Sequence, residues 1–178
     1  VAEGALIFSS RSWGEGKIEP IREVTNIALR FGVGLALLLS LLVLLIPEML
    51  LGLLTSDREI IAEGAKYARI IGFSYPVFAI SQILMIMLRS VETVRISFYL
   101  SIVTFVTNVM LNYLLIFGNG GFPELGCAGA AIATLCARLL ELGLIAAYVR
   151  LIDRKVELRL PHVLCKLNRR MLRDYIRV

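Results

Sequence analysis

Two asparagines lie inside one of the most apolar stretches of the chain. Asn108 and Asn112 fall within residues 96–123, which contain no Asp, Glu, Lys or Arg. Residues four apart share one face of an α-helix, so both carboxamides are expected on the same side. Their oxygens could coordinate a cation or bind a polar group of a substrate. The structural alternative is interhelical hydrogen bonding, at about 0.6 kcal/mol per bond. The spacing leaves both interpretations open.

A run of small residues occupies positions 126–134 and ends at Thr134. Small side chains let two helix backbones approach closely, which favours a role in packing. Thr134 is the member of the run that adds a ligand oxygen. Packing is the default role of this run, and Thr134 is its one candidate ligand.

Two further features could control movement. Arg138 and Glu141 lie three residues apart in the last apolar stretch, where a helix would let them pair and where an unpaired charge would be costly. They form either a structural ion pair or part of a gate. Pro76 removes a backbone hydrogen bond from another apolar stretch, which predicts either a static kink or a hinge.

Enzyme and metal motifs were sought without success. The chain has no HExxH motif, no Gly-rich phosphate loop and no Ser-His-Asp set, and its single histidine is His162. Its three cysteines, Cys127, Cys136 and Cys165, show no CxxC spacing. We expect no enzyme activity, no catalytic residues, no metal site and no cofactor.

The elements that must position the candidate residues are membrane-spanning helices. Hydrophobic residues make up 58% of the chain, above the content of a soluble domain. About 20 apolar residues cross a bilayer as a helix. We predict an all-α, polytopic transmembrane helical bundle over 27–150, with its spans near 29–53, 67–88, 96–117 and 126–149.

The two flanks differ from this bundle. Residues 1–26 are expected to be the end of a truncated transmembrane helix and a cytoplasmic connector, as in an internal fragment that begins at Val1. Residues 151–178 have leucines spaced three and four apart among basic residues, which is typical of an amphipathic helix on the inner membrane surface. A calmodulin-type or nucleic-acid target is the alternative for this tail, but we expect no nucleic-acid partner.

Basic residues set the expected orientation. Residues 1–30, residues 89–95 and residues 150–178 together hold fifteen Lys and Arg, whereas the opposite ends of the spans hold three. An excess of Lys and Arg marks the cytoplasmic side of a membrane protein. The N-terminal connector and the C-terminal tail are therefore predicted to be cytoplasmic.

The third and fourth spans resemble the multidrug and toxic compound extrusion (MATE) family. The similarity rests on an asparagine-bearing helix at 108–118, a Gly/Pro turn at 121–126 and the small-residue helix start at 129–134. Weaker matches are Trp13-Gly14, Thr55-Ser-Asp57 with Tyr67, and Leu88-Arg89-Ser90. The resemblance runs from about residue 4 to 158.

Family members have twelve spans in two six-helix halves. The resemblance therefore implies that this chain corresponds to the end of helix 2 through helix 6, which is part of the first half. It also implies that the C-terminal half of the transporter is a partner missing from this sequence. It also implies that Asn108, Asn112 and Thr134 match polar residues of a cation- or proton-responsive cavity. Some members have an aspartate where Asn112 stands, which leaves Na⁺ or H⁺ coupling open.

Two positions depart from the family pattern. Arg11 stands where glutamine is common, and Glu92 stands where glycine is usual after the Leu-Arg-Ser element. Both lie at the expected cytoplasmic edge, so they bear on the local turn rather than on the cavity.

The implied function is a secondary active antiporter in the cytoplasmic (inner) membrane of a prokaryote. It would export amphipathic or cationic organic compounds in exchange for Na⁺ or H⁺, with small organic substrates and membrane lipids as its partners. Two alternatives stay open. One is a lipid-linked oligosaccharide flippase of the same superfamily, which would need a cationic cavity for an anionic head group; the acid partner expected for Arg138 argues against it. The other is a non-transporting membrane scaffold.

Overall fold

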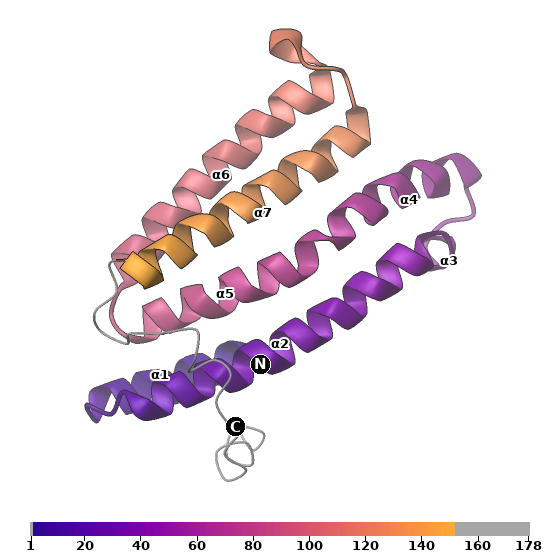
Figure 1. Cartoon of the computed structure of the whole chain (residues 1–178). Helices are drawn as coiled ribbons and strands as arrows, with labels where there is room; N and C mark the ends of the chain where they lie inside the picture. The colour runs from indigo at the N-terminus through magenta and orange to yellow at the C-terminus, as the bar shows by residue number, and fades with distance from the viewer. Residues whose placement is uncertain (1, 152–178) are drawn as a thin grey trace. The chain divides into compact units, whose positions relative to one another are not determined.

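The computed structural model describes residues 2–151, with the backbone alone for residues 2 and 3. Every element in that range is helical, as Figure 1 shows, so the predicted all-α class is confirmed. The elements are α1 (Ala2–Gly14), α2 (Glu19–Leu45), α3 (Pro47–Gly52), α4 (Arg58–Gly72), α5 (Ser74–Ser90), α6 (Val94–Phe117), a 3-10 turn (Asn119–Gly121) and α7 (Gly126–Leu151). The predicted tail helix, with His162 and Cys165, lies outside the described residues apart from Leu151.

Three of these helices, α2, α6 and α7, are long and apolar enough to cross a membrane. The pair α4 and α5 passes the same test together but is bent by 47° at a short break. Counted as one span, this pair brings the total among the described residues to the four that the sequence predicted. α6 ends at Phe117, and residues 118–125 connect it to α7.

The first long helix differs from its predicted span in both directions. α2 begins at Glu19, so residues 19–28, which precede the predicted span, extend the helix, and the link from α1 is confined to residues 15–18. At the other end, Ile46 separates α2 from α3. Pro47 opens α3, and a proline is tolerated at that position because the first N–H of a helix has no intrahelical acceptor.

α1 ends in a Schellman motif. The N–H of Gly16 donates to the carbonyl of Trp13 at 2.9 Å, and that of Lys17 donates to Ser12 at 3.0 Å. These two bonds require a left-handed residue between them, and Gly16 has φ +71°. Glycine adopts this conformation without a steric penalty, so the turn into α2 is unstrained.

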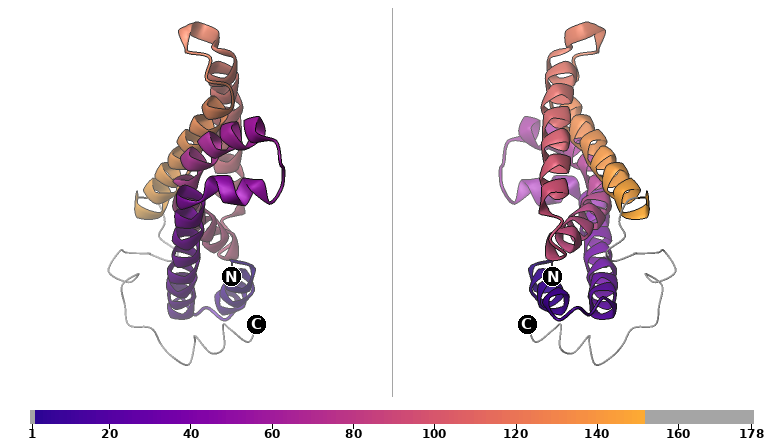
Figure 2. Two further views of the ribbon diagram at one scale, coloured as in Figure 1. Left: turned by 90° about the vertical axis from the view of Figure 1, so that its right-hand side faces the viewer. Right: turned by 90° about the vertical axis from the view of Figure 1, so that its left-hand side faces the viewer.

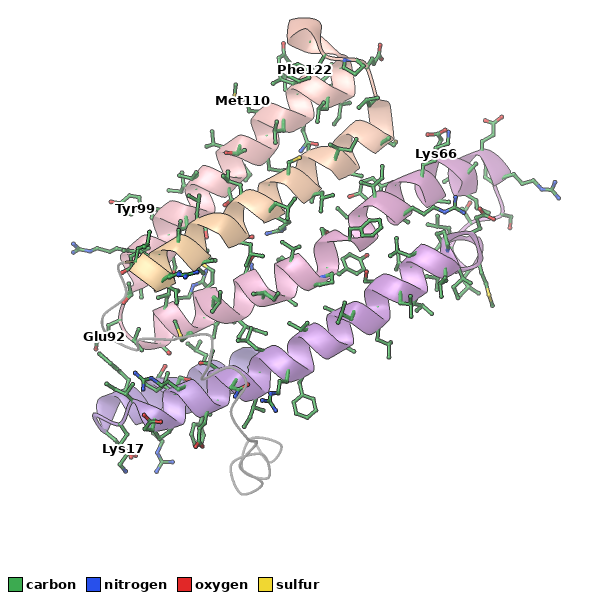
Figure 3. All side chains as sticks on the ribbon, in the orientation of Figure 1. Lys17, Lys66, Glu92, Tyr99, Met110 and Phe122 are labelled. Atoms are coloured by element: carbon green, nitrogen blue, oxygen red, sulfur yellow. The ribbon has the colours of Figure 1, made fainter. Side chains whose placement is uncertain are left out.

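α5 ends in the same hydrogen-bond pattern with a different residue. The N–H of Glu92 donates to Arg89 at 3.3 Å, and that of Thr93 donates to Leu88 at 3.0 Å. Glu92 carries the left-handed backbone, with φ +60°. The predicted departure from glycine therefore falls on a position whose geometry favours glycine. Figure 3 labels Glu92 in this turn.

Charges surround the α1–α2 link. Lys17 Nζ lies 2.8 Å from Glu15 Oε2, and Arg11 Nε lies 3.4 Å from Glu15 Oε1. The hydrogen bond and charge of Lys17, followed by those of Arg11, lower the pKa of Glu15 below its usual value. These groups are exposed, so the pairs add little stability. Arg11, the other departure from the family pattern, is exposed and contacts Glu15.

α3 and α4 form a small helical hairpin, whose loop is visible in both views of Figure 2. Asp57 caps α4 by accepting a bond from the N–H of Glu59 at 2.9 Å. Arg69 of α4 pairs with Glu48 of α3 at 3.2 Å. Gly64 leaves room for Leu51, because a Cβ there would lie 2.9 Å from Leu51 Cδ1.

The described chain divides into two compact units. Unit 1 comprises residues 2–34, 79–100 and 142–151, and unit 2 comprises 35–78 and 101–141. Unit 1 contains two clusters of buried apolar side chains, most of them large. Their buried members are Ala5, Ile21, Val24, Ala28, Leu29, Ile83, Met85, Met87, Leu88, Val91, Ile145 and Val149.

Apart from Pro47, the buried hydrophobic residues of unit 2 are all alanines. They are Ala36, Ala65, Ala131, Ala133 and Ala137. Side chains this small let helix backbones come close together. Unit 2 also contains every predicted site residue, so the candidate site is built on close backbone contacts rather than on bulky apolar packing.

Candidate functional site

The candidate site begins with the polar face of α6, by which we mean Ser101, Thr104, Asn108 and Asn112. These residues recur at intervals of three and four, and all are buried or half-buried. The opposite side of the helix carries exposed apolar residues, including Met110, which Figure 3 shows projecting away from α7. The sequence analysis singled out the two asparagines and missed the two hydroxyls, although the spacing of 101, 104, 108 and 112 is a helical repeat.

The two asparagines contact each other directly. Asn112 Nδ2 donates to Asn108 Oδ1 at 3.0 Å, and both side chains are half-buried. Among the described residues, neither side chain has a further hydrogen-bond partner. The bond orients the pair and leaves the oxygen of Asn112 with both lone pairs for a cation or a donor.

Thr134 sits on α7 and bonds within its own helix. Its Oγ1 donates to the carbonyl of Ala130 at 2.9 Å, and the side chain is half-buried. The hydroxyl proton of Thr134 is therefore used in this hydrogen bond, whereas its oxygen still has lone pairs that can accept a donor or bind a cation. In the described part of the chain, hydrogen bonds do not join Thr134 to either asparagine.

α6 and α7 are in close backbone contact where α7 begins. A Cβ added to Gly129 would lie 2.4 Å from the backbone oxygen of Leu115. The same oxygen accepts a bond from the N–H of Leu125 at 3.0 Å. Buried Ala133 and Ala137 continue the small face one and two turns further along α7. This contact fixes the helix that carries Thr134 against the helix that carries the asparagines.

Arg138 and Glu141 form the ion pair that their spacing predicted. Arg138 Nη1 donates to Glu141 Oε2 at 2.9 Å, and the carboxylate side chain is only 4% exposed. The guanidinium also lies 4.4 Å from the ring centroid of Phe78 on α5, a cation–π distance. Sequence reasoning missed Phe78, because nothing in the sequence pairs it with Arg138.

The kink predicted from Pro76 is present. α4 ends at Gly72, Phe73 interrupts the helix, and Pro76 lies in the first turn of α5. Ser40 of α2 donates from Oγ to the carbonyl of Gly72 at 2.8 Å. That carbonyl lies four residues before the proline, so its usual intrahelical donor does not exist.

Comparison with known proteins places the chain in a family. The model of the MatE family matches residues 1–114. A probable multidrug resistance protein NorM of Rhizobium meliloti is 35% identical over 152 residues, which are 84% of this chain and 32% of that protein. The probable multidrug resistance protein YoeA of Bacillus subtilis is 27% identical over 150 residues, again 84% of this chain and 32% of that protein. The chain thus spans about a third of the length of these relatives.

Solved structures share the fold. An inward-facing multidrug resistance MATE family transporter of the MOP superfamily superposes with a TM-score of 0.84 at 20% identity, covering 98% of this chain and 39% of that one. The outward-facing conformation of such a transporter gives 0.85 at 20% identity, covering 98% and 38%. The relatives are named as transporters and multidrug resistance proteins rather than as enzymes, in line with the sequence expectation. Because the family model matches more than half of the residues, the chain belongs to the MatE family of helical membrane transporters.

Proposed function

We propose that the chain is part of a secondary active antiporter that exports amphipathic or cationic organic compounds in exchange for Na⁺ or H⁺. The supporting observation is the half-buried asparagine pair on the polar face of α6 in a chain whose relatives are named multidrug resistance proteins. Polar groups inside a membrane bundle are costly and usually line a substrate or ion path.

The proposed mechanism is alternating access, in which two halves of the transporter rock about a central binding region. Asn108 and Asn112 offer amide oxygens, and Thr134 offers a hydroxyl oxygen. Oxygen ligands of this kind suit a hard cation such as Na⁺. The α6 polar face has no ionisable side chain, so a proton-coupled mechanism would need an acid from elsewhere in the transporter.

The proposed location is the cytoplasmic membrane of a prokaryote, with the α1–α2 link, the α5–α6 turn and the tail on the cytoplasmic side. The distribution of Lys and Arg supports this orientation. Large exposed apolar side chains along α2, such as Leu38 at 62% and Leu45 at 70%, support membrane lipids as the surrounding partner. The remaining partners proposed are small organic substrates and a second half of the transporter.

The flippase alternative fits the geometry less well. An anionic lipid-linked head group needs an available intramembrane cation. Arg138 lies in the middle of the α7 span, whereas Arg150 lies in its last turn, and Glu141 and the Phe78 ring engage the Arg138 guanidinium. The ion pair therefore favours the antiporter over the flippase.

Substitution of Asn112 by leucine tests the proposal against the scaffold alternative. Asn112→Leu removes the oxygen of the pair while it preserves an apolar helix, so we expect export of a cationic dye from cells to be lost at normal membrane abundance. Met110→Leu is the matched control, because Met110 is 62% exposed on the same helix. Unchanged export by Asn112→Leu would favour the scaffold.

A further inference from the structure

The break between α4 and α5 has a separate attachment on each side, both within unit 2. Before the break, the backbone carbonyl of Gly72 at the end of α4 accepts a hydrogen bond from the Ser40 hydroxyl of α2 at 2.8 Å. After it, Phe78 on α5 lies under the Arg138 guanidinium of α7 at 4.4 Å. The break itself is short and bent by 47°.

The first attachment compensates for the proline. Pro76 has no N–H, so the Gly72 carbonyl lacks the donor that a continuous helix would provide. Ser40 is 6% exposed, and a buried carbonyl in lipid has no water to replace a lost donor. Gly72 permits the contact, since a Cβ there would already lie 3.2 Å from Leu44 of α2. Separating α2 from α4 therefore leaves a buried acceptor without its donor.

The second attachment is of another kind. The guanidinium of Arg138 is held by Glu141 on its own helix, and its contact with Phe78 is a stacking contact without a fixed hydrogen-bond direction. Such a contact tolerates small rotations of the ring better than a hydrogen bond does. At the break, the Phe73 N–H donates to the Ile70 carbonyl at 3.3 Å, and the Ser74 hydroxyl donates to the Ile71 carbonyl at 2.7 Å. These local hydrogen bonds replace the regular backbone hydrogen bonds of a continuous α-helix.

We propose that the segment from Gly72 to Pro76 is a hinge, at which α4 moves with α2 through the Ser40 bond while α5 moves with α7 through Phe78 and Arg138. Ser40 is a positioning residue of this hinge, which keeps α4 on α2 as the bend changes. The hinge does not depend on the identity of the substrate or the coupling ion, and its motion is measurable without either.

A stability cycle on the detergent-purified protein tests the Ser40 attachment. Ser40→Ala should lower the melting temperature. Pro76→Ala restores an N–H that can bond to Gly72, so in that background Ser40→Ala should lose most of its effect. Ser90, which donates to Met87 at 2.7 Å on α5, provides the control, because Ser90→Ala and Pro76→Ala should be additive. Additive effects of Ser40→Ala and Pro76→Ala would overturn the attachment.

Spin labels test the motion. Cysteines replace exposed Ile60 on α4 and Arg89 on α5 after Cys127, Cys136 and Cys165 are changed to serine. At a 1.5 Å rise per residue, straightening the 47° bend moves these two points apart by about 4 Å. We expect a broad distance distribution in vesicles, a further broadened one in Ser40→Ala and a single longer distance in Pro76→Ala. One narrow distance common to the unsubstituted protein and Ser40→Ala would show a static kink and overturn the hinge.

Discussion

The two units of this chain are packed by opposite means. Unit 1 buries large apolar side chains such as Ile21, Leu88 and Ile145, each fully enclosed. Unit 2 buries alanines, and its specific contacts are polar: Asn112 to Asn108, and Ser40 to the Gly72 carbonyl. The two units therefore differ in the size of the residues that face inward.

This difference suggests a division of labour within one transporter segment. Interlocked large side chains resist rearrangement because any shift opens a cavity. Small residues and a few hydrogen bonds allow helices to slide or pivot with fewer contacts to break. Unit 1 is therefore expected to set stability, and unit 2 is expected to set activity.

Truncation of a large side chain in unit 1 should give the largest loss. Leu88→Ala removes a fully buried side chain from the larger cluster and should cost about 2–5 kcal/mol of unfolding free energy. Thermal melting in detergent measures it. Leu54→Ala, at a residue 84% exposed, should change the stability by less than about 0.5 kcal/mol. Equal effects of the two substitutions would remove the basis of the comparison.

An added methyl group should damage unit 2 nearly as much. Gly129→Ala places a Cβ at 2.4 Å from the Leu115 oxygen, which forces α6 and α7 apart at a cost of about 1–3 kcal/mol. Gly143→Ala lies on the same helix with nothing within 4 Å, and should stabilise α7 by about 0.5–1 kcal/mol. Chemical denaturation compares the two variants. The same sign of change in both would contradict the proposed close approach.

Substitutions in the Arg138–Glu141 ion pair distinguish a structural role of the pair from a role in gating. Arg138→Leu leaves the buried Glu141 carboxylate without its partner, and we expect a cost of about 1–3 kcal/mol. Replacing both residues by leucine leaves no bare charge, so the double variant should be more stable than the single one. Dye export by the double variant then decides: retained export indicates a structural pair, and lost export at normal stability indicates a gate.

The smallest expected effect comes from the two Schellman turns of unit 1. The left-handed backbone of Glu92 costs about 1–2 kcal/mol relative to glycine. The greater freedom of glycine in the unfolded chain offsets part of that gain. Glu92→Gly should therefore raise the unfolding free energy by about 0.5–1 kcal/mol. Gly16→Ala, at φ +71°, should lower it, and a gain in both variants would show that the turns do not govern stability.

Much of this arrangement was predictable from local sequence rules. Apolar length predicted the helices, the spacing of Arg138 and Glu141 predicted their pairing, and Pro76 predicted the kink. The start of α2 was missed because Glu19 and the polar residues after it are compatible with a helix that projects beyond an apolar span. Span prediction measures apolarity, whereas helix formation depends on backbone hydrogen bonds.

The contacts between distant residues were not predictable. Ser40 and Gly72 lie 32 residues apart, and neither has a neighbour in sequence that suggests the other. The same holds for Phe78 and Arg138. Ser101 and Thr104 were overlooked for a different reason, because hydroxyls are common in spans and become informative only when α6 is seen to turn them inward. The roles of Asn108, Asn112 and Thr134 in ion or substrate binding stay predictions.

Two polar pairs, one in α6 and one in α7, are close in sequence, and this bears on how the protein is made. Asn112 bonds four residues back, and Arg138 bonds three residues ahead, each within a single helix. A helix leaving the ribosome can thus mask its own polar groups before any neighbouring helix arrives. The insertion machinery would meet α6 and α7 as largely neutralised segments, which lowers the barrier to their entry into lipid during synthesis.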